Sequence, residues 1–160
     1  MNTRDLAVGA IIAALYASGV IVLAPISFFQ FQVRVADALI PLSLLFGMPA
    51  VWGVTLGAVV GNVYGGLGYV DILGGALANL LAAYVGWRLG ARSFVGALFI
   101  ATVAQTLIVS SIVGFYLAAL FGGPLEAWFI GVFFGSIIAI NILGYLLVEA
   151  IQRSGLQPKS

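Results

Sequence analysis

Two carboxylates and several amides are the main polar groups of an otherwise apolar stretch between Arg34 and Arg88. Asp37 and Asp71 are the only ionised side chains between those two arginines. A polar group in such surroundings is costly to maintain, which makes it a candidate for function. Carboxylates and amides satisfy the donors and acceptors at the edge of a planar heterocycle, and aromatic rings stack on its faces. The candidate substrate-binding residues are Arg34, Asp37, Asn62, Asp71, Asn79, Gln105 and Asn141.

The composition indicates an integral membrane protein. Of the 160 residues, 63% are hydrophobic and 7% are charged, against about 45–50% and about 25% in soluble domains. The net charge of +1 is too small and too scattered for a nucleic-acid partner. Cysteine and histidine are absent, which excludes disulfides, thiolate nucleophiles, imidazole bases and the usual transition-metal ligands. The sequence also lacks a Gly-rich phosphate-binding loop, so we expect no cofactor and no nucleotide hydrolysis by this chain.

Charge-free apolar runs predict an all-α bundle of six transmembrane helices. The expected spans are residues 6–24, 38–46, 50–64, 71–88, 94–120 and 127–150. The run 38–66 is too long for one untilted span, and Gly47 and Pro49 favour a turn within it. Lysines and arginines then place both termini in the cytoplasm, with Arg34 alone on the outer side. A five-span alternative, with 38–66 as one helix and the amino terminus outside, fits the charge bias equally well.

The segment between the first two spans has a different pattern. Over residues 28–37 large apolar side chains alternate with polar or small ones, which predicts an extended segment at an interface or dipping into the protein. In the six-span arrangement this segment, the glycine-rich loop before Asp71, and Glu126 all lie on the outer side. We therefore expect three acidic side chains and one arginine to gather at that face.

Several of these candidates also have a purely structural interpretation. Arg34 and Asp37 are three residues apart, and they either organise the outer loop as a lid or pair only to anchor it. Asp71 is placed to cap the following helix. Asn62 lies on a glycine-rich span, where a ligand or a neighbouring backbone can come close. Amides and serines inside lipid commonly join helices, which is the alternative for Asn79 and the later candidates.

Small residues form two adjacent rows on the first span. One row is Ala10, Ala14 and Ser18, and the other is Gly9, Ala13 and Ala17. Small residues at this spacing let another helix approach closely in lipid. The rows therefore predict either packing within this chain or a docking face for a separate membrane subunit.

Spaced anchors in the first half of the chain resemble a family of transporters. They are Gln-Val-Arg-Val-Ala-Asp-Ala-Leu at 32–39, Pro41, Pro-Ala-Val-Trp-Gly at 49–53, Gly57, Asn62 and Gly-Tyr-Val-Asp-Ile-Leu-Gly at 68–74. The pattern resembles the queuosine-precursor transporter (QueT) family, the substrate-binding subunits (S components) of energy-coupling-factor (ECF) transporters. The chain departs from it at Asp37, where members usually have glutamate, and at Asn79, where threonine is usual. The proline and asparagine pattern of the fifth span is not evident near 104–106.

The resemblance implies a six-helix subunit of the cell membrane that captures a vitamin or base-like solute from outside. It implies a 7-deazaguanine precursor of queuosine as ligand, with the small face of the first helix docking onto a transmembrane coupling protein driven by two cytoplasmic ATPases. An alternative is a small intramembrane enzyme with Ser110 or Ser111 as nucleophile and Asp71 or Glu126 as base, although no span offers a histidine or lysine to activate a serine. A second alternative is a self-sufficient carrier without ATPase partners.

Overall fold

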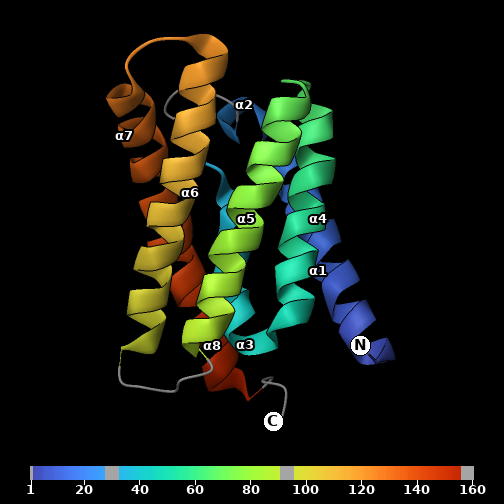
Figure 1. Cartoon of the computed structure of the whole chain (residues 1–160). Helices are drawn as coiled ribbons and strands as arrows, with labels where there is room; N and C mark the ends of the chain where they lie inside the picture. Colours follow the sequence, from blue (N-terminus) through green and yellow to red (C-terminus); the bar gives the residue numbers. More distant parts are fainter. Residues whose placement is uncertain (1, 28–32, 91–95, 156–160) are drawn as a thin grey trace.

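The computed structural model describes residues 2–27, 33–90 and 96–155, and these residues form an all-helical bundle. The start of α1 and the end of α8 lie at one end of the bundle, and α2 lies at the other (Figure 1). The described helices, including the 3₁₀-helix η1 and the π-helix η2, are α1 (Thr3–Val22), α2 (Ala24–Ser27), η1 (Val35–Leu42), α3 (Ser43–Phe46), α4 (Met48–Gly65), α5 (Tyr69–Gly90), α6 (Ala97–Phe121), α7 (Leu125–Ser136), η2 (Ile137–Gly144) and α8 (Tyr145–Ser154).

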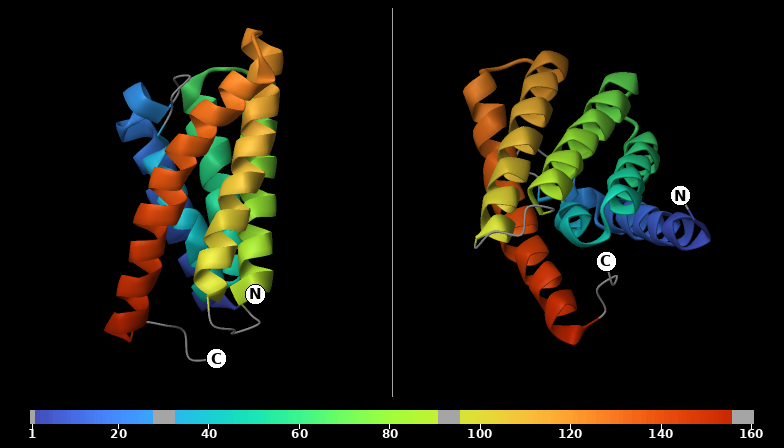
Figure 2. Two further views of the ribbon diagram at one scale, coloured as in Figure 1. Left: turned by 90° about the vertical axis from the view of Figure 1, so that its left-hand side faces the viewer. Right: turned by 60° about the horizontal axis from the view of Figure 1, so that its bottom comes forward.

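Four helices within the described residues are long and apolar enough to cross a membrane. They are α1, α5, α6 and the continuous run of α7, η2 and α8 from Leu125 to Ser154. The left view of Figure 2 shows this last run as one long rod. Helix α4 is 18 residues long, and η1 together with α3 forms a shorter apolar helix, Val35–Phe46. The chain is therefore a multi-pass membrane protein.

The apolar run 38–66 is divided where its glycine and proline predicted a turn. Helix α3 ends at Phe46 and α4 begins at Met48. Gly47 between them has a φ of 62°, which a residue with a Cβ rarely adopts. A Cβ at Gly47 would also lie 3.1 Å from Nε1 of Trp87. The five-span alternative required one continuous helix over this run, and the structure does not have one.

Glycines on α4 bring it into direct contact with α1. A Cβ at Gly53 would lie 2.8 Å from the carbonyl oxygen of Gly9, and one at Gly57 would lie 2.9 Å from that of Ala13. A Cβ at Gly61 would lie 2.9 Å from Cβ of Val20. No real Cβ fits at such distances, so the three glycines are what allows the two backbones to approach. Gly9 and Ala13 of the second row are therefore used for packing within the chain, and Ala17 of the same row is buried.

The expectation that residues 28–37 are extended is wrong for their last part, although burial there agrees with the alternative of a segment that dips into the protein. Val35 begins the 3₁₀-helix η1, and Arg34 and Asp37 are buried inside the bundle. Residues 28–32 lie outside the described part of the chain. The two-residue alternation was misleading because η1 is a short 3₁₀-helix. It has too few residues to show the three-residue period of such a helix.

The last span contains a feature that the sequence did not predict. Its middle third, η2, is a π-helix, whereas an unbroken α-helix was expected over 127–150. Gly144 at the end of η2 packs on η1: a Cβ there would lie 2.8 Å from Cγ of Pro41 and 3.0 Å from the carbonyl oxygen of Ala38. Single π-turns within α-helices occur frequently at functional sites.

Candidate substrate site

Asn62, Asp71 and Tyr116, here called the Asp71 cluster, join three helices near the end of the bundle that holds α2. The Tyr116 hydroxyl on α6 donates a hydrogen bond to Oδ1 of Asp71 at 2.9 Å. Nδ2 of Asn62 on α4 donates to the backbone oxygen of Asp71, also at 2.9 Å. Asp71 and Asn62 are fully buried, with exposed fractions of 1% and 0%. The cluster is therefore a polar site enclosed by α4, α5 and α6.

Two adjacent glycines of α5 make room for this cluster. A Cβ at Gly74 would lie 2.5 Å from the ring of Tyr116, and one at Gly75 would lie 2.2 Å from Nδ2 of Asn62. Neither distance is possible for real atoms, so Gly74 fixes where the tyrosine ring lies and Gly75 admits the amide. Conformational freedom is not the reason for either glycine, because both lie inside a helix.

Two acceptor atoms of the Asp71 cluster are buried without a hydrogen-bond partner. They are Oδ2 of Asp71 and Oδ1 of Asn62. A buried acceptor that is left unsatisfied costs about 1–3 kcal/mol, and more when it is charged. The expected capping role of Asp71 is wrong in this structure, because Oδ1 accepts from Tyr116 and Oδ2 accepts from no helix amide. The carboxylate lies in the first turn of α5 but is directed across the bundle.

Tyr16, Arg34, Asp37 and Asn79, the Asp37 cluster, form a second buried polar group. The Tyr16 hydroxyl on α1 donates to Oδ1 of Asp37 on η1. Nδ2 of Asn79 on α5 donates to the backbone oxygen of Val54 on α4 at 3.2 Å. Arg34, Asp37 and Asn79 line one small hollow together with Ser136 and with valines of α6 and α7. Four elements that are distant in sequence thus meet around one group of polar side chains.

Arg34 connects the two clusters electrostatically. Its positive charge interacts electrostatically with the carboxylates of both Asp37 and Asp71 and with both tyrosine hydroxyls. The carboxylates are 34 positions apart in the sequence, and the same cation acts on both. Arg34, Asp37, Asn62, Asp71 and Asn79 thus lie in two neighbouring buried clusters, and their role in binding a ligand stays a prediction.

The hollow beside Arg34 is small. Its volume is about 10 Å³, close to the lower limit for one water molecule. Pockets for organic ligands have volumes on the order of 300 Å³ or more. A heterocyclic ligand can therefore enter only if the helices or side chains around Arg34 move apart.

Gln105 and Asn141 lie in other contacts. Nε2 of Gln105 donates to Oγ of Ser43 at 3.3 Å, in space left by Gly86. Asn141 in η2 accepts from Thr106 and donates to Thr102 at 3.3 Å, so it joins η2 to α6. Neither residue lines the hollow beside Arg34. A role for them in ligand binding stays a prediction.

Tyr16 and Ser136 were missed by sequence reasoning. A single tyrosine in an apolar helix carries no spacing signal, and its partner Asp37 is 21 positions away. Ser136 is the last residue of α7 and lines the hollow. Tyr116 is one of the aromatic side chains whose rings are able to stack on a ligand. The structure shows it as the hydrogen-bond donor to Asp71.

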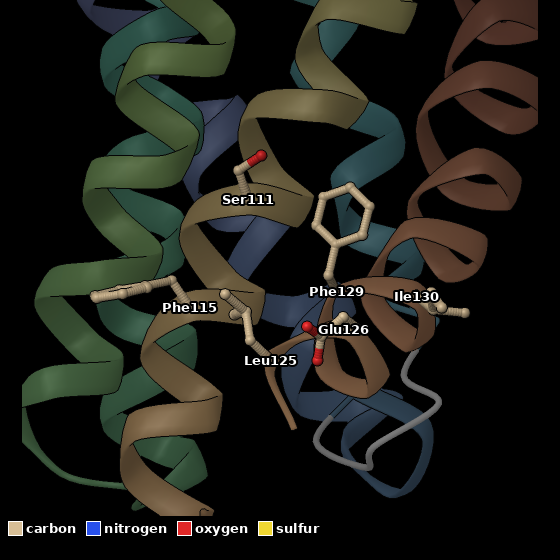
Figure 3. A pocket seen from close by; sticks show the side chains of 6 residues that line it. All are labelled: Ser111, Phe115, Leu125, Glu126, Phe129 and Ile130. Carbon is tan, nitrogen blue, oxygen red and sulfur yellow. The ribbon is translucent and has the colours of Figure 1, made fainter. Parts of the chain in front are cut away.

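Two larger hollows lie on the outside of the bundle and are mostly apolar. One has a volume of about 440 Å³ and lies between α6 and α7 (Figure 3). The Ser111 hydroxyl and the Glu126 carboxylate lie well apart in it (Figure 3). The other, of about 610 Å³, lies between α5 and α6 and includes Tyr116 in its wall. Ser110 donates back to the carbonyl oxygen of Thr106 at 2.7 Å, so neither serine contacts a base.

The apolar helices of membrane-spanning length define the class of this protein, a multi-pass membrane protein. The chain belongs to the QueT transporter family, whose model matches residues 6–153 and therefore nearly the whole chain. Members of this family are S components of ECF transporters, the components that bind the substrate. No curated protein and no solved structure matches the chain.

Proposed function

We propose that this chain is the substrate-binding subunit of an ATP-driven uptake transporter for a queuosine precursor of the 7-deazaguanine type. The observation that carries the proposal is the Asp71 cluster, in which two buried acceptors, Oδ2 of Asp71 and Oδ1 of Asn62, have no partner. The family match supplies the class of protein, and the cluster supplies a site that requires hydrogen-bond donors.

The proposed ligand has the groups that this site requires. The pyrimidine edge of a 7-deazaguanine presents N–H donors, which suit the carboxylate of Asp71 and the amide oxygen of Asn62. It also presents a carbonyl acceptor, which suits the Arg34 guanidinium. The ring of Tyr116, held in place at Gly74, offers a face on which a planar ring can stack.

The other half of the proposal concerns energy coupling. We infer six crossings of the cell membrane, with η1 and α3 as the second, both termini in the cytoplasm, and the Asp71 cluster toward the outside. Ala10, Ala14 and Ser18 are exposed on α1, while the adjacent row is occupied by α4. The exposed row is the proposed contact with a transmembrane coupling protein that carries two ATPases.

The test is ligand binding by the purified chain in detergent or nanodiscs. We expect Asn62→Ala and Asp71→Ala to reduce affinity for 7-deazaguanines by at least about tenfold, because each removes a hydrogen-bond partner from an enclosed site. Glu126→Ala, which removes an exposed carboxylate outside the site, is the matched control and should bind normally. Unchanged affinity after both site substitutions would remove this site assignment.

A flux measurement distinguishes between two hypotheses, a self-sufficient carrier and a subunit that needs partners. We expect liposomes that contain this chain alone to bind the ligand without accumulating it. Uptake by such liposomes at the rate of the complete transporter would favour the carrier instead.

A further inference from the structure

Two mostly apolar hollows on the outside of the bundle lie on either side of α6. The hollow between α6 and α7 has a volume of about 440 Å³, and the hollow between α5 and α6 has a volume of about 610 Å³. Both volumes are in the range of pockets that hold organic ligands. Ser111 and Phe115 on α6 line both hollows, and Phe115 is 67% exposed. The two hollows therefore have one wall in common.

The hollows extend over the depth of one lipid leaflet. Ten residues of helix lead from Ser111 to Phe121 at the end of α6, which corresponds to about 15 Å. The hydrocarbon core of a bilayer is about 30 Å thick, so one leaflet accounts for about half of it. The ring of Trp128 stacks on Phe121 at this end, and its Nε1 donates to the carbonyl oxygen of Gly122. Tryptophan at a helix end is typical of the headgroup level, so the hollows lie among the acyl chains below it.

Glu126 lies at the headgroup end of the hollow between α6 and α7, in the first turn of α7 (Figure 3). In the described part of the chain it is the only charged side chain exposed at this end of the bundle. Arg34, Asp37 and Asp71 are buried. The other described charged residues belong to the opposite end (Figure 1), and they are Arg4, Asp5, Arg88, Glu149 and Arg153. A lipid headgroup beside Glu126 therefore meets a negative charge that no exposed cation of these residues neutralises.

We propose that the two hollows hold the acyl chains of one phospholipid, and that its primary ammonium headgroup donates hydrogen bonds to the carboxylate of Glu126. One chain lies between α6 and α7 and the other between α5 and α6, on either side of Phe115. An ammonium group brings both a positive charge and N–H donors to the carboxylate, whereas an anionic headgroup places a like charge beside it. This inference goes beyond the proposed function and does not depend on which solute the chain binds.

The test is native mass spectrometry of the purified chain after incubation with phosphatidylethanolamine and phosphatidylglycerol in equal amounts and with the same acyl chains. We expect one phospholipid to be retained per chain, with the ethanolamine headgroup favoured about two- to fivefold, as for an exposed ion pair. Glu126→Gln, which keeps the shape and removes the charge, should retain the lipid and lose the preference. Equal retention of both lipids by the unsubstituted chain, or a preference that survives Glu126→Gln, overturns the proposal.

A second pair of variants tests the hollows themselves. Ser111→Phe adds a ring to the wall that the hollows share, and it should abolish retention of both lipids. Ala119→Phe, at an exposed position of α6 outside both hollows, is the matched control and should retain them. Equal thermal unfolding of the two variants shows that the loss is not caused by misfolding, and the Glu126→Gln comparison decides if they differ. Lipid retention by Ser111→Phe, or a dimer that this change converts to a monomer, overturns the proposal; the dimer would assign the hollows to a second copy of the chain.

Discussion

The hydroxyl of Tyr16 donates a hydrogen bond to the carboxylate of Asp37, and this bond joins α1 to η1 inside the bundle. One face of α1 packs on α4 and includes Tyr16, whose hydroxyl reaches the polar interior, while the row of Ala10, Ala14 and Ser18 is exposed. The proposed docking helix is therefore in direct contact with the Asp37 cluster.

Replacing Tyr16 by phenylalanine removes this bond and leaves the ring. Asp37 is buried, and a hydrogen bond to a charged group contributes about 1.5–3 kcal/mol. We expect Tyr16→Phe to lower the thermal unfolding temperature of the protein in detergent. Tyr69→Phe is the matched control because Tyr69 is 76% exposed, and it should melt like the unsubstituted chain. Equal melting of both variants would mean that the Tyr16 bond contributes nothing to stability.

Gly57→Ala tests the contact between α1 and α4. The added Cβ would lie 2.6 Å from Cβ of Tyr16 and 2.9 Å from the carbonyl oxygen of Ala13, so the two helices must separate. We expect a loss of about 1–3 kcal/mol in stability, the usual cost of overpacking. Thermal unfolding measures it, with Val60→Ala on the exposed side of α4 as the control. A Gly57→Ala protein as stable as the control would contradict the close approach of these helices.

Gly75→Ala tests the position of the Asn62 amide without replacing any side chain of the proposed binding site. The added Cβ would lie 2.2 Å from Nδ2 of Asn62, so the amide must leave its position. We expect the affinity for 7-deazaguanines to fall by about tenfold or more. Because both changes act through one amide, Gly75→Ala combined with Asn62→Ala should be no worse than Asn62→Ala alone. Additive losses would show that Gly75 acts through something other than Asn62.

A larger side chain on the exposed row of α1 should block transport without affecting ligand binding. Ala14 is exposed, so Ala14→Leu changes no internal contact and should leave ligand affinity unchanged. It should abolish uptake by the complete transporter, since close helix approach needs a small residue there. Ala119→Leu on the exposed side of α6 is the control with the same added volume. Normal uptake by Ala14→Leu would place the coupling protein elsewhere.

Local signals in the sequence predicted much of the fold. Gly47 and Pro49 marked the division of the long apolar run, and the charge-free runs located the long helices. The irregular helices were missed for a physical reason. A 3₁₀- or π-turn differs from an α-turn by one residue in its hydrogen bonding, and apolar sequences as short as η1 and η2 do not reveal that difference.

The sequence predicted most residues of the two buried clusters but not the hydrogen bonds that join them. Burial costs alone singled out Asp37 and Asp71. Their tyrosine partners are 21 and 45 positions away, and no spacing rule connects residues so distant. The helix cap expected for Asp71 was wrong for a different reason. The expectation came from a rule about neighbouring residues, but the carboxylate instead accepts a hydrogen bond from the distant Tyr116.

The pairing of η1 with η2 determines where the bundle is most easily deformed. Helices α1, α4, α5 and α6 are regular α-helices, whereas a 3₁₀-segment and a π-segment can each rewind by one residue toward the α form. These two segments pack against each other at Gly144 and Pro41, and they lie beside Arg34, Asp37 and Ser136. The two segments that can rewind thus lie next to this hollow, which a ligand could enter only by widening it, whereas α1 and α4 are held in close backbone contact.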